Sequence, residues 1–234
     1  MKRIIAIGGG ELRERTTLKI DEYIAKLAKE RAGERRANAL FIPTASHDFM
    51  PYYNTFHKVY TGGFDIKTDV ALTVFKEPDL ERLKAKFDKA DVIYVGGGDT
   101  VFMMREWEKS GLLTLIKDAY ERGVILAGLS AGAICWFTDI YTDSALVNGE
   151  TDEKYAMFKG LGWKTGVISP HYNTRMLDFD KIVCYNYQSA FGIEDNSAIV
   201  IEDGEIVGSI SSGGKAWKLT VKEGEIEKEE IAEI

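Results

Sequence analysis

The 234-residue chain is poor in cysteine, with two, and in histidine, with three. Cys135 and Cys184 lie in apolar or helical-looking segments, which favours a reducing cytoplasm over a disulfide-stabilised secreted domain. Long hydrophobic runs are missing, and the apolar stretch at the N-terminus is broken at once by glycines and charges. We therefore expect neither a signal peptide nor a membrane span, and a cytoplasmic location.

Positive charge is also scarce. The 30 Lys and Arg are outnumbered by 37 Asp and Glu, which gives a formal net charge of -7, and no basic tract concentrates the cations. Because nucleic-acid binding depends on concentrated Lys and Arg, a nucleic-acid partner is not expected. No cluster of His, Cys or Asp has the spacing of metal ligands, so neither a metal nor a cofactor is expected.

Short β-rich runs alternate along the chain with stretches of helical periodicity. The β-rich runs span 3–7, 39–43, 91–95 and 124–128. Their continuous apolarity indicates strands that are covered on both faces. Apolar residues recur at helical spacing within 18–27, 80–87 and 112–119. The alternation predicts an α/β fold in a single domain over 1–234, with a doubly wound, mostly parallel sheet and helices on both faces.

The pattern changes after residue 196. Two β-rich runs flank Glu202-Asp203-Gly204, which is a hairpin signal, and an acidic tail follows them. We expect an antiparallel C-terminal extension at the edge of the sheet, with the tail as a solvated edge or last strand. The tail and the edge strands could support a homodimer.

The segment Gly128-Leu129-Ser130-Ala131-Gly132 places a serine between two glycines, after a predicted strand and before a helical pattern. This arrangement is typical of a nucleophile elbow, in which small neighbours allow a strained backbone to expose the hydroxyl. The amide of Ala131 would then point toward a developing oxyanion at a helix N-terminus. The alternative is a tight turn whose serine caps the helix.

A second glycine-rich turn, Val95-Gly96-Gly97-Gly98-Asp99-Thr100, also follows a predicted strand. Its glycines allow backbone amides to approach a ligand, and Asp99 or Thr100 can cap the next helix. The run lacks the lysine of a phosphate-binding loop and the spacing of a dinucleotide-binding one. A second oxyanion donor suits it better, although a plain tight turn would explain it about as well.

A histidine base for Ser130 has three candidates, His47, His57 and His171. His57 lies in a helix-like stretch and is better explained as a surface or packing residue. His47 and His171 each follow a predicted strand end and could border the site. The sequence prefers His171 to His47 only modestly.

The acid that would orient such a histidine has two candidates, Glu194 and Asp195, directly before the β-rich run 198–201. An ordinary turn formed by the Asp-Asn pair at 195–196 is the alternative.

Three motifs together, GLSAGA at 128–133, VGGGDT at 95–100 and the histidine of PHY at 170–172, resemble the serine peptidase family that contains aspartyl dipeptidase (peptidase E) and cyanophycinase. The similarity extends from the N-terminal strand to the acidic turn near 195. The family has a fold similar to class I glutamine amidotransferases, with serine instead of cysteine at the elbow. The resemblance implies a serine peptidase that hydrolyses short peptides through an acyl-enzyme, without a cofactor.

Carried over by position, the resemblance implies Ser130 as the nucleophile and His171 as the general base. The acid of the family follows a Gly-Leu/Ile pair by two residues, which points to Asp195 with Glu194 as the fallback. The implied oxyanion hole uses the amide of Ala131 and one from Gly97 or Gly98.

Two features depart from the family pattern. Asp99 stands where the family usually has Asn, and its charge near the pocket would disfavour acidic substrates. The link after His171 is shorter than in the aspartyl dipeptidases and lacks their Gly-Glu-Thr-Arg stretch. Arg175, its only arginine, could bind a substrate carboxylate or form an ion pair with Asp178. Hydrolysis is therefore better supported than aspartyl specificity.

Three other functions stay open. The same residues could serve an esterase or amidase that acts on a small nonpeptide substrate. A noncatalytic binding protein could retain the fold, in which case Ser130 would be inert to serine reagents. A cysteine-dependent enzyme would need Cys135, five residues after Ser130, whose simpler explanation is a small buried hydrophobe in the helix.

Overall fold

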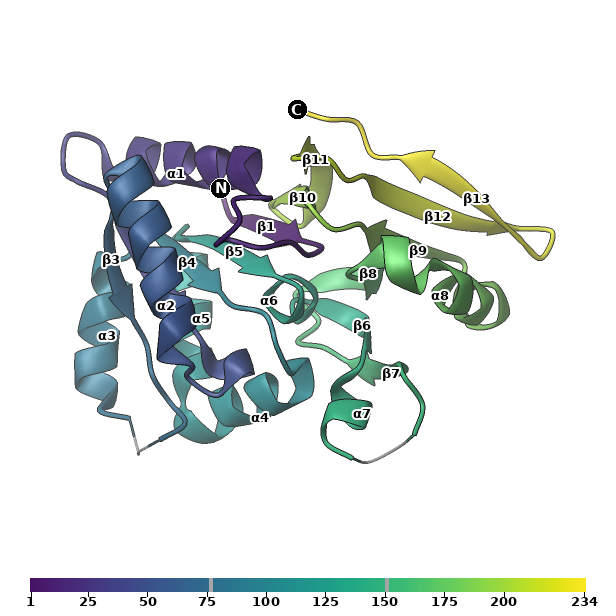
Figure 1. Cartoon of the computed structure of the whole chain (residues 1–234), viewed down its shortest axis with the longest axis horizontal. Helices are drawn as coiled ribbons and strands as arrows, with labels where there is room; N and C mark the ends of the chain where they lie inside the picture. The colour runs from purple at the N-terminus through teal and green to yellow at the C-terminus, as the bar shows by residue number, and fades with distance from the viewer. Residues whose placement is uncertain (76–77, 150–151) are drawn as a thin grey trace.

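The computed structural model describes residues 1–75, 78–149 and 152–234, which form two sheets with helices packed against them (Figure 1). In spatial order the first sheet consists of β11 (Glu205–Ser211), β10 (Ser197–Glu202), β1 (Arg3–Ile7), β5 (Ile125–Leu129), β4 (Val92–Val95), β2 (Asn38–Ile42) and β3 (Lys67–Val70). The strands from β1 to β3 in this order run parallel, and β10 and β11 are antiparallel at the edge. The predicted doubly wound, mostly parallel sheet is confirmed.

Alternate residues of the buried strands face opposite layers of helices. In β1, Ile5 and Ile7 belong to one apolar cluster, whereas Ile4 and Ala6 belong to another. The first cluster includes residues of α1 (Leu18–Ala32), α2 (Met50–His57) and the π-helical turn η2 (Lys58–Gly63). The second includes residues of α3 (Leu80–Lys89), α4 (Thr100–Ser110) and α5 (Leu112–Glu121). Strands that are covered on both faces explain the continuous apolar runs of the sequence.

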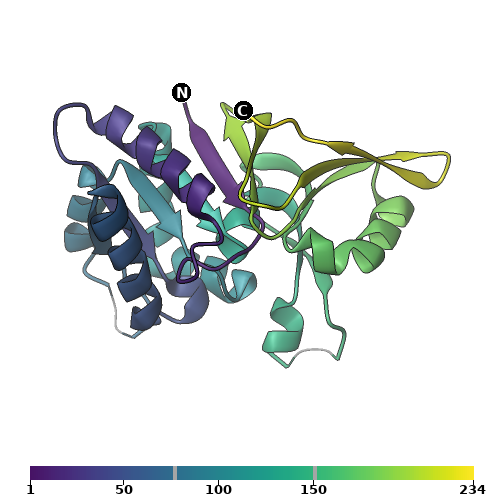
Figure 2. The same ribbon diagram turned by 45° about the horizontal axis from the view of Figure 1, so that its top comes forward.

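A second sheet, which the sequence did not predict, follows the first along the chain. In spatial order it consists of β13 (Glu225–Glu230), β12 (Ala216–Lys222), β9 (Ser189–Ile193), β8 (Lys164–Ser169), β6 (Phe137–Thr142) and β7 (Ala156–Lys159). Helix α8 (Tyr172–Asn186) packs against it through Phe179 and Val183, which share an apolar cluster with Val167 and Leu219. Figure 2 shows β12 and β13 extending away from the first sheet.

The antiparallel C-terminal extension is confirmed but is divided between the two sheets. The hairpin predicted at 202–204 joins β10 to β11 through Asp203 and Gly204, whose φ angles are 46° and 90°. The acidic tail contributes β13, which pairs with β12 in the second sheet. Since β13 is almost wholly exposed, its sequence carries no apolar pattern that could have placed it there.

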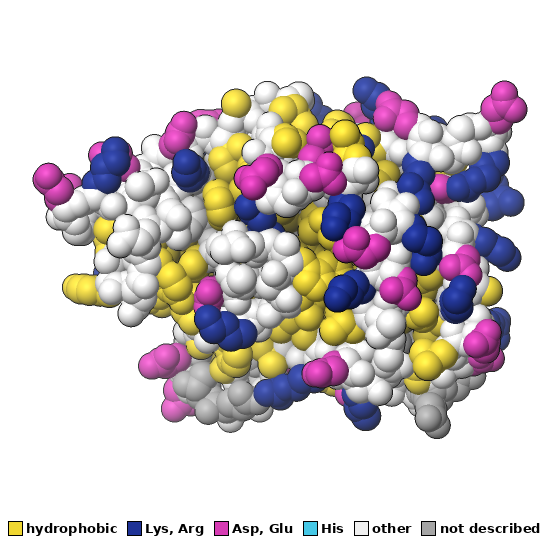
Figure 3. Space-filling model, turned by 180° about the vertical axis from the view of Figure 1, so that it is seen from behind, with side chains coloured by type: hydrophobic (Ala, Val, Ile, Leu, Met, Phe, Trp, Pro, Cys, Tyr) yellow, Lys and Arg dark blue, Asp and Glu magenta, His cyan; other side chains and the backbone are white. Residues whose placement is uncertain are grey.

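The surface carries charges of both signs. Seen from behind, Lys and Arg are interspersed with Asp and Glu, and hydrophobic side chains gather toward the middle of the face (Figure 3). Neither sign of charge therefore dominates this face. In the described part of the chain, every helix is too short or too polar to span a bilayer.

A carboxyl group is buried on the inner face of α1. Asp21 is 1% exposed, and it accepts hydrogen bonds from the Thr17 hydroxyl at 2.7 Å and from the Tyr60 hydroxyl at 2.8 Å. Burial raises the pKa of Asp21 to about 6, although the two hydrogen bonds favour the ionised form. Ionisation of this group in the folded protein is therefore unfavourable.

Stability should consequently fall as Asp21 ionises. Because its folded-state pKa lies above the ordinary 3.8, the favourable contribution of the protonated carboxyl is complete below about pH 4 and is lost as the pH rises through about 6. The expected loss is at most about 3 kcal/mol. Asp21→Asn removes the titration and should remove this part of the pH dependence. Urea unfolding of both proteins from pH 4 to pH 8 measures it, and parallel pH profiles would contradict the assignment.

Candidate active site

Ser130 lies on a sharp turn between β5 and the short helix α6 (Ala131–Ile134), with φ 52° and ψ -105°. A methyl group on Gly128 would run into the carbonyl of Gly132, and one on Gly132 would run into the carbonyl of Val95. The two glycines of the motif are therefore needed because the backbone segments touch. The turn has the strand, strained residue and helix of an elbow.

The helix after the elbow is shorter than the sequence indicated. It has four residues, and the chain enters β6 at Phe137. Cys135 is the residue that follows α6, not part of a longer helix, and it is fully buried. Burial raises the pKa of its thiol well above the ordinary value, so the reactive thiolate is disfavoured.

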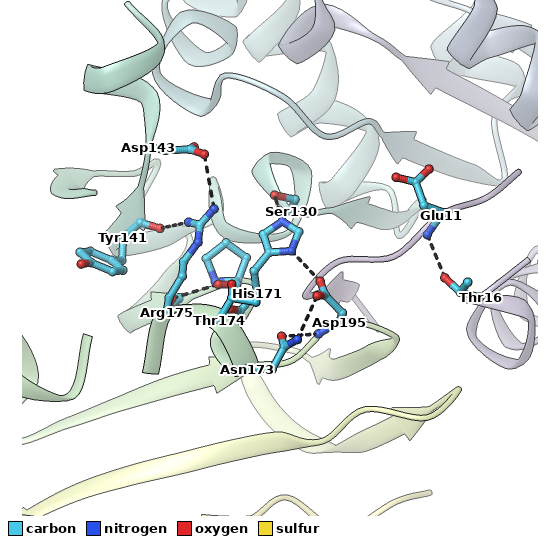
Figure 4. Close-up of polar contacts among 12 residues, drawn as sticks. Glu11, Thr16, Ser130, Tyr141, Asp143, His171, Asn173, Thr174, Arg175 and Asp195 are labelled. Atoms are coloured by element: carbon cyan, nitrogen blue, oxygen red, sulfur yellow. Dashed lines mark hydrogen bonds and ion pairs between the residues drawn. The ribbon is translucent and has the colours of Figure 1, made fainter. Parts of the chain in front are cut away.

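The structure brings Ser130, His171 and Asp195 together (Figure 4). Ser130 Oγ lies 2.8 Å from His171 Nε2, and Asp195 Oδ1 lies 2.5 Å from His171 Nδ1. Ser130 comes from the first sheet, whereas His171 follows β8 and Asp195 follows β9 in the second. The site therefore depends on how the two sheets meet.

Asp195 is held in the orientation that its contact with His171 requires. Its other oxygen accepts a hydrogen bond from Asn173 Nδ2 at 3.0 Å, and its own amide donates to Asn173 Oδ1 at 3.1 Å. The hydrogen bond with His171 lowers the pKa of Asp195, with a further contribution from Asn173. An ionised Asp195 accepts a hydrogen bond from the Nδ1–H group of His171. The unprotonated Nε2 is then free to accept the proton of the Ser130 hydroxyl.

Glu194, the fallback acid, points elsewhere. It accepts hydrogen bonds from Trp217 Nε1 at 2.9 Å and from the backbone amide of Lys215 at 3.0 Å. Both partners lie at the start of β12 or just before it. Of the two neighbouring carboxylates, the structure brings only Asp195 to His171.

The other two histidines have different partners. His57 is exposed on α2, with Nδ1 2.6 Å from Thr68 Oγ1. The ring of His47 packs on Phe102, with ring centroids 4.1 Å apart. Neither lines the cavity that contains Ser130.

The glycines at 8–10, which were not among the predicted site residues, lie directly against the site and help to position its backbone. The consecutive carbonyls of residues 7–9 accept hydrogen bonds from the amides of Ser130 at 2.8 Å, His171 at 3.0 Å and Asn196 at 2.9 Å. A methyl group on Gly9 would overlap the ring of His171 and the carboxylate of Asp195. The signal was available, since these glycines follow the first strand as the noted run at 96–98 follows another.

The residues predicted to donate to an oxyanion lie around Ser130. The amide of Ala131 is the first of α6, and such an amide has no acceptor within its own helix. Gly97 is adjacent, because a methyl group on it would lie 3.5 Å from Ser130 Cβ. Its amide donates a long hydrogen bond of 3.3 Å to the Tyr52 hydroxyl. Gly98 lines the same cavity with φ 138°, a conformation that favours glycine.

Asp99 serves as the N-cap of α4. One carboxylate oxygen accepts hydrogen bonds from the amides of Val101 at 3.0 Å and Phe102 at 3.1 Å. The other accepts from Asn148 Nδ2 at 2.8 Å. Asp99 is buried and does not line the cavity, so the structure does not bring this predicted substrate-binding residue to Ser130.

Arg175 is also engaged inside the protein. It is 6% exposed, forms an ion pair with Asp143 at 3.6 Å and donates to the Tyr141 carbonyl at 3.2 Å (Figure 4). Its guanidinium group also lies over the ring of Tyr155, 4.5 Å from the centroid. The predicted ion pair with Asp178 is wrong, because the side chain turns inward toward β6 instead of running along the surface of α8.

A cavity of about 590 Å³ opens beside Ser130 and His171. Its wall comes from residues 10–13 after β1, from the start of α2 and the residue before it, and from residues 97–98 after β4. It thus lies beyond the carboxyl ends of the parallel strands, where ligands bind in this class of fold. Among the described residues, no group of three or more His, Cys, Asp or Glu side chains could hold a metal ion.

Comparison with known proteins identifies relatives over almost the whole chain. The model of peptidase family S51 matches residues 4–208. The uncharacterized peptidase YgaJ of Bacillus subtilis is 32% identical over 237 residues, covering 97% of this chain and 95% of that protein. Peptidase E of Salmonella gallinarum is 45% identical over 49 residues, or 21% of each chain. The crystal structure of a peptidase from an acI-B1 actinobacterium covers 100% of this chain and 95% of its own with a TM-score of 0.70 at 17% identity, which shows a shared fold.

The adjacent carboxylates allow a matched test of the site. Asp195→Asn keeps the shape of the side chain but cannot stabilise the charged histidine, so kcat for hydrolysis should fall by about 10⁴-fold. Glu194→Gln removes the same charge one residue away and should leave kcat within a few fold. Steady-state kinetics of the two variants at pH 7.5 decides whether Asp195 or Glu194 is the acid that orients His171. Equal losses, or a larger loss for Glu194→Gln, would show that the acid is misassigned.

Proposed function

Because the chain belongs to peptidase family S51, we propose that it is a serine peptidase that hydrolyses short peptides in the manner of a dipeptidase, with Ser130 as the nucleophile. The observation that carries the proposal is the hydrogen-bonded series Ser130, His171 and Asp195 at the edge of a cavity. A nucleophile, a base within hydrogen-bond reach and a group that orients the base are the requirements of covalent acyl transfer.

In the acylation step, His171 Nε2 takes the proton of the Ser130 hydroxyl as Oγ attacks the carbonyl carbon of the scissile bond. The electron pair of the carbonyl moves to its oxygen, and the resulting negative charge is stabilised by the amides of Ala131 and of Gly97 or Gly98. The C–N bond then breaks, and the amine leaves with the proton that His171 returns. Asp195 stabilises the positive charge of His171 between these transfers.

Water completes the reaction by the same route. It gives a proton to His171 and attacks the ester carbonyl on Ser130. As the second tetrahedral intermediate collapses, the bond between the acyl carbon and Oγ breaks, His171 returns the proton to Oγ, and the acid is released. Gly97 would serve as an oxyanion donor if its long contact with Tyr52 gave way to the stronger acceptor. Each step uses only groups of the chain, water and the peptide.

Cys135 is a poorer nucleophile than Ser130 at this site. Its buried thiol donates to the Gly132 carbonyl at 3.7 Å, and burial raises its pKa. Ser130, in contrast, lines the cavity with its oxygen directed toward His171. The volume of the cavity is in the range that holds a short peptide. Aspartyl specificity is not part of the proposal, because Arg175 is already paired within the protein.

Removing the hydroxyl should abolish hydrolysis. On a panel of dipeptides that differ in their first residue, Asp included, Ser130→Ala should lower kcat/KM by about 10⁴-fold or more, since the nucleophile is lost. Cys135→Ala should retain activity within a few fold and serves as the matched control. Circular dichroism of both variants checks that they are folded. Hydrolysis that survives in Ser130→Ala, or that disappears in Cys135→Ala, would refute the serine mechanism.

A further inference from the structure

A turn between β1 and α1 carries an acidic side chain along the cavity. The amide of Glu11 donates to Thr16 Oγ1 at 2.9 Å, and the amide of Thr16 donates back to the Glu11 carbonyl at 3.2 Å (Figure 4). Inside this loop the amide of Arg15 donates to the carbonyl of Leu12 at 3.2 Å. These hydrogen bonds hold the backbone after Glu11. The residue before it, Gly10, belongs to the glycines that support the site.

The carboxylate of Glu11 is available to a ligand. Glu11 lines the same cavity as Ser130 and His171. Its charge also acts on the phenol of Tyr52 across the cavity: burial raises the pKa of Tyr52 to about 12, and the negative charge of Glu11 adds to the effect. Within the described residues, no Lys or Arg forms an ion pair with Glu11. Glu11 is thus an exposed acidic residue on the wall of the cavity without an ion-pair partner among the described residues, and its carboxylate suits a cationic group on the ligand.

Most of the remaining wall is apolar. The side chains of Leu12, Phe49, Pro51 and Leu129 line it together with the ring of Tyr52. Such a wall favours an uncharged, apolar side chain on the bound molecule. Arg13, the other charged residue of the lining, has the wrong sign to bind a cation. Next to the proposed nucleophile the cavity therefore offers one carboxylate, the guanidinium group of Arg13 and an apolar surface.

We propose that Glu11 binds the free α-ammonium group of the peptide, so that the site acts on unblocked N-termini whose first side chain is apolar. This inference rests on the proposed function. The ammonium group of the first residue is two bonds from the carbonyl that Ser130 attacks, so its partner must line the same cavity, as Glu11 does. Asp as the first residue is disfavoured, since it brings a second carboxylate toward Glu11.

The test compares free and N-acetylated Leu-Ala as substrates of the native protein, Glu11→Gln and Glu14→Gln. Glu14 is exposed on the same turn and does not line the cavity, so its variant is a matched control for charge. A hydrogen-bonded charge pair of this kind is worth about 10- to 100-fold in kcat/KM. The native protein and Glu14→Gln should prefer the free peptide by that factor. In Glu11→Gln, kcat/KM for the free peptide should fall by that factor, mainly through a higher KM. The value of kcat/KM for the acetylated peptide should not change.

Labelling of Ser130 by a fluorophosphonate, which carries no ammonium group, separates the possible failures. The labelling rate should be the same in all three proteins. If Glu11→Gln keeps the native preference for the free peptide, or if its labelling falls together with hydrolysis, the assignment of Glu11 is overturned. A native preference for Asp-Ala over Leu-Ala would also overturn it. If the native protein hydrolyses other dipeptides of the panel but not Leu-Ala, the inference fails; if it hydrolyses no dipeptide of the panel, the proposed function itself fails.

Discussion

The end of β1 is the constraint on which the site depends. Consecutive carbonyls of residues 7–9 accept the amides of Ser130, His171 and Asn196, the residue next to Asp195. One short piece of backbone thus fixes three segments that come from two sheets. Side chains would block this arrangement, which explains the glycines at 8–10: a methyl group on Gly9 would occupy the space where the histidine and the acid meet.

Hydrogen bonding and burial determine the ionisation of the groups around Ser130. The hydrogen bond between Asp195 and His171 holds the carboxylate ionised and fixes the proton of the ring on Nδ1. The Ser130 hydroxyl faces the other ring nitrogen, Nε2, and the first amide of α6 follows Ser130 in the chain. The cysteine nearby is left without a role, because burial favours its neutral thiol.

The sequence predicted the parts whose signal is local. The parallel strands and the helices packed on them carry continuous apolar runs or helical periodicity, and the glycine-flanked turn at Ser130 is a single contiguous motif. The second sheet was not predictable in this way, since strands such as β7 are half-buried and lack such a pattern. The acidic tail does form a solvated edge strand, β13, as expected, but its sequence did not show that it belongs to a separate sheet. Arg175 was misjudged for a similar reason: its partner Asp143 is distant in sequence, whereas Asp178 is one helical turn away.

We propose above all that Ser130 forms the covalent intermediate. The most direct measurement treats the active protein with a fluorophosphonate, follows the loss of peptide hydrolysis, and locates the adduct by fragmenting the tryptic peptide that begins at Gly123. If Ser130 is the nucleophile, we expect one phosphonyl group per chain, on Ser130, in proportion to the activity lost. An adduct on Cys135, or full loss of activity with Ser130 unmodified, would contradict it.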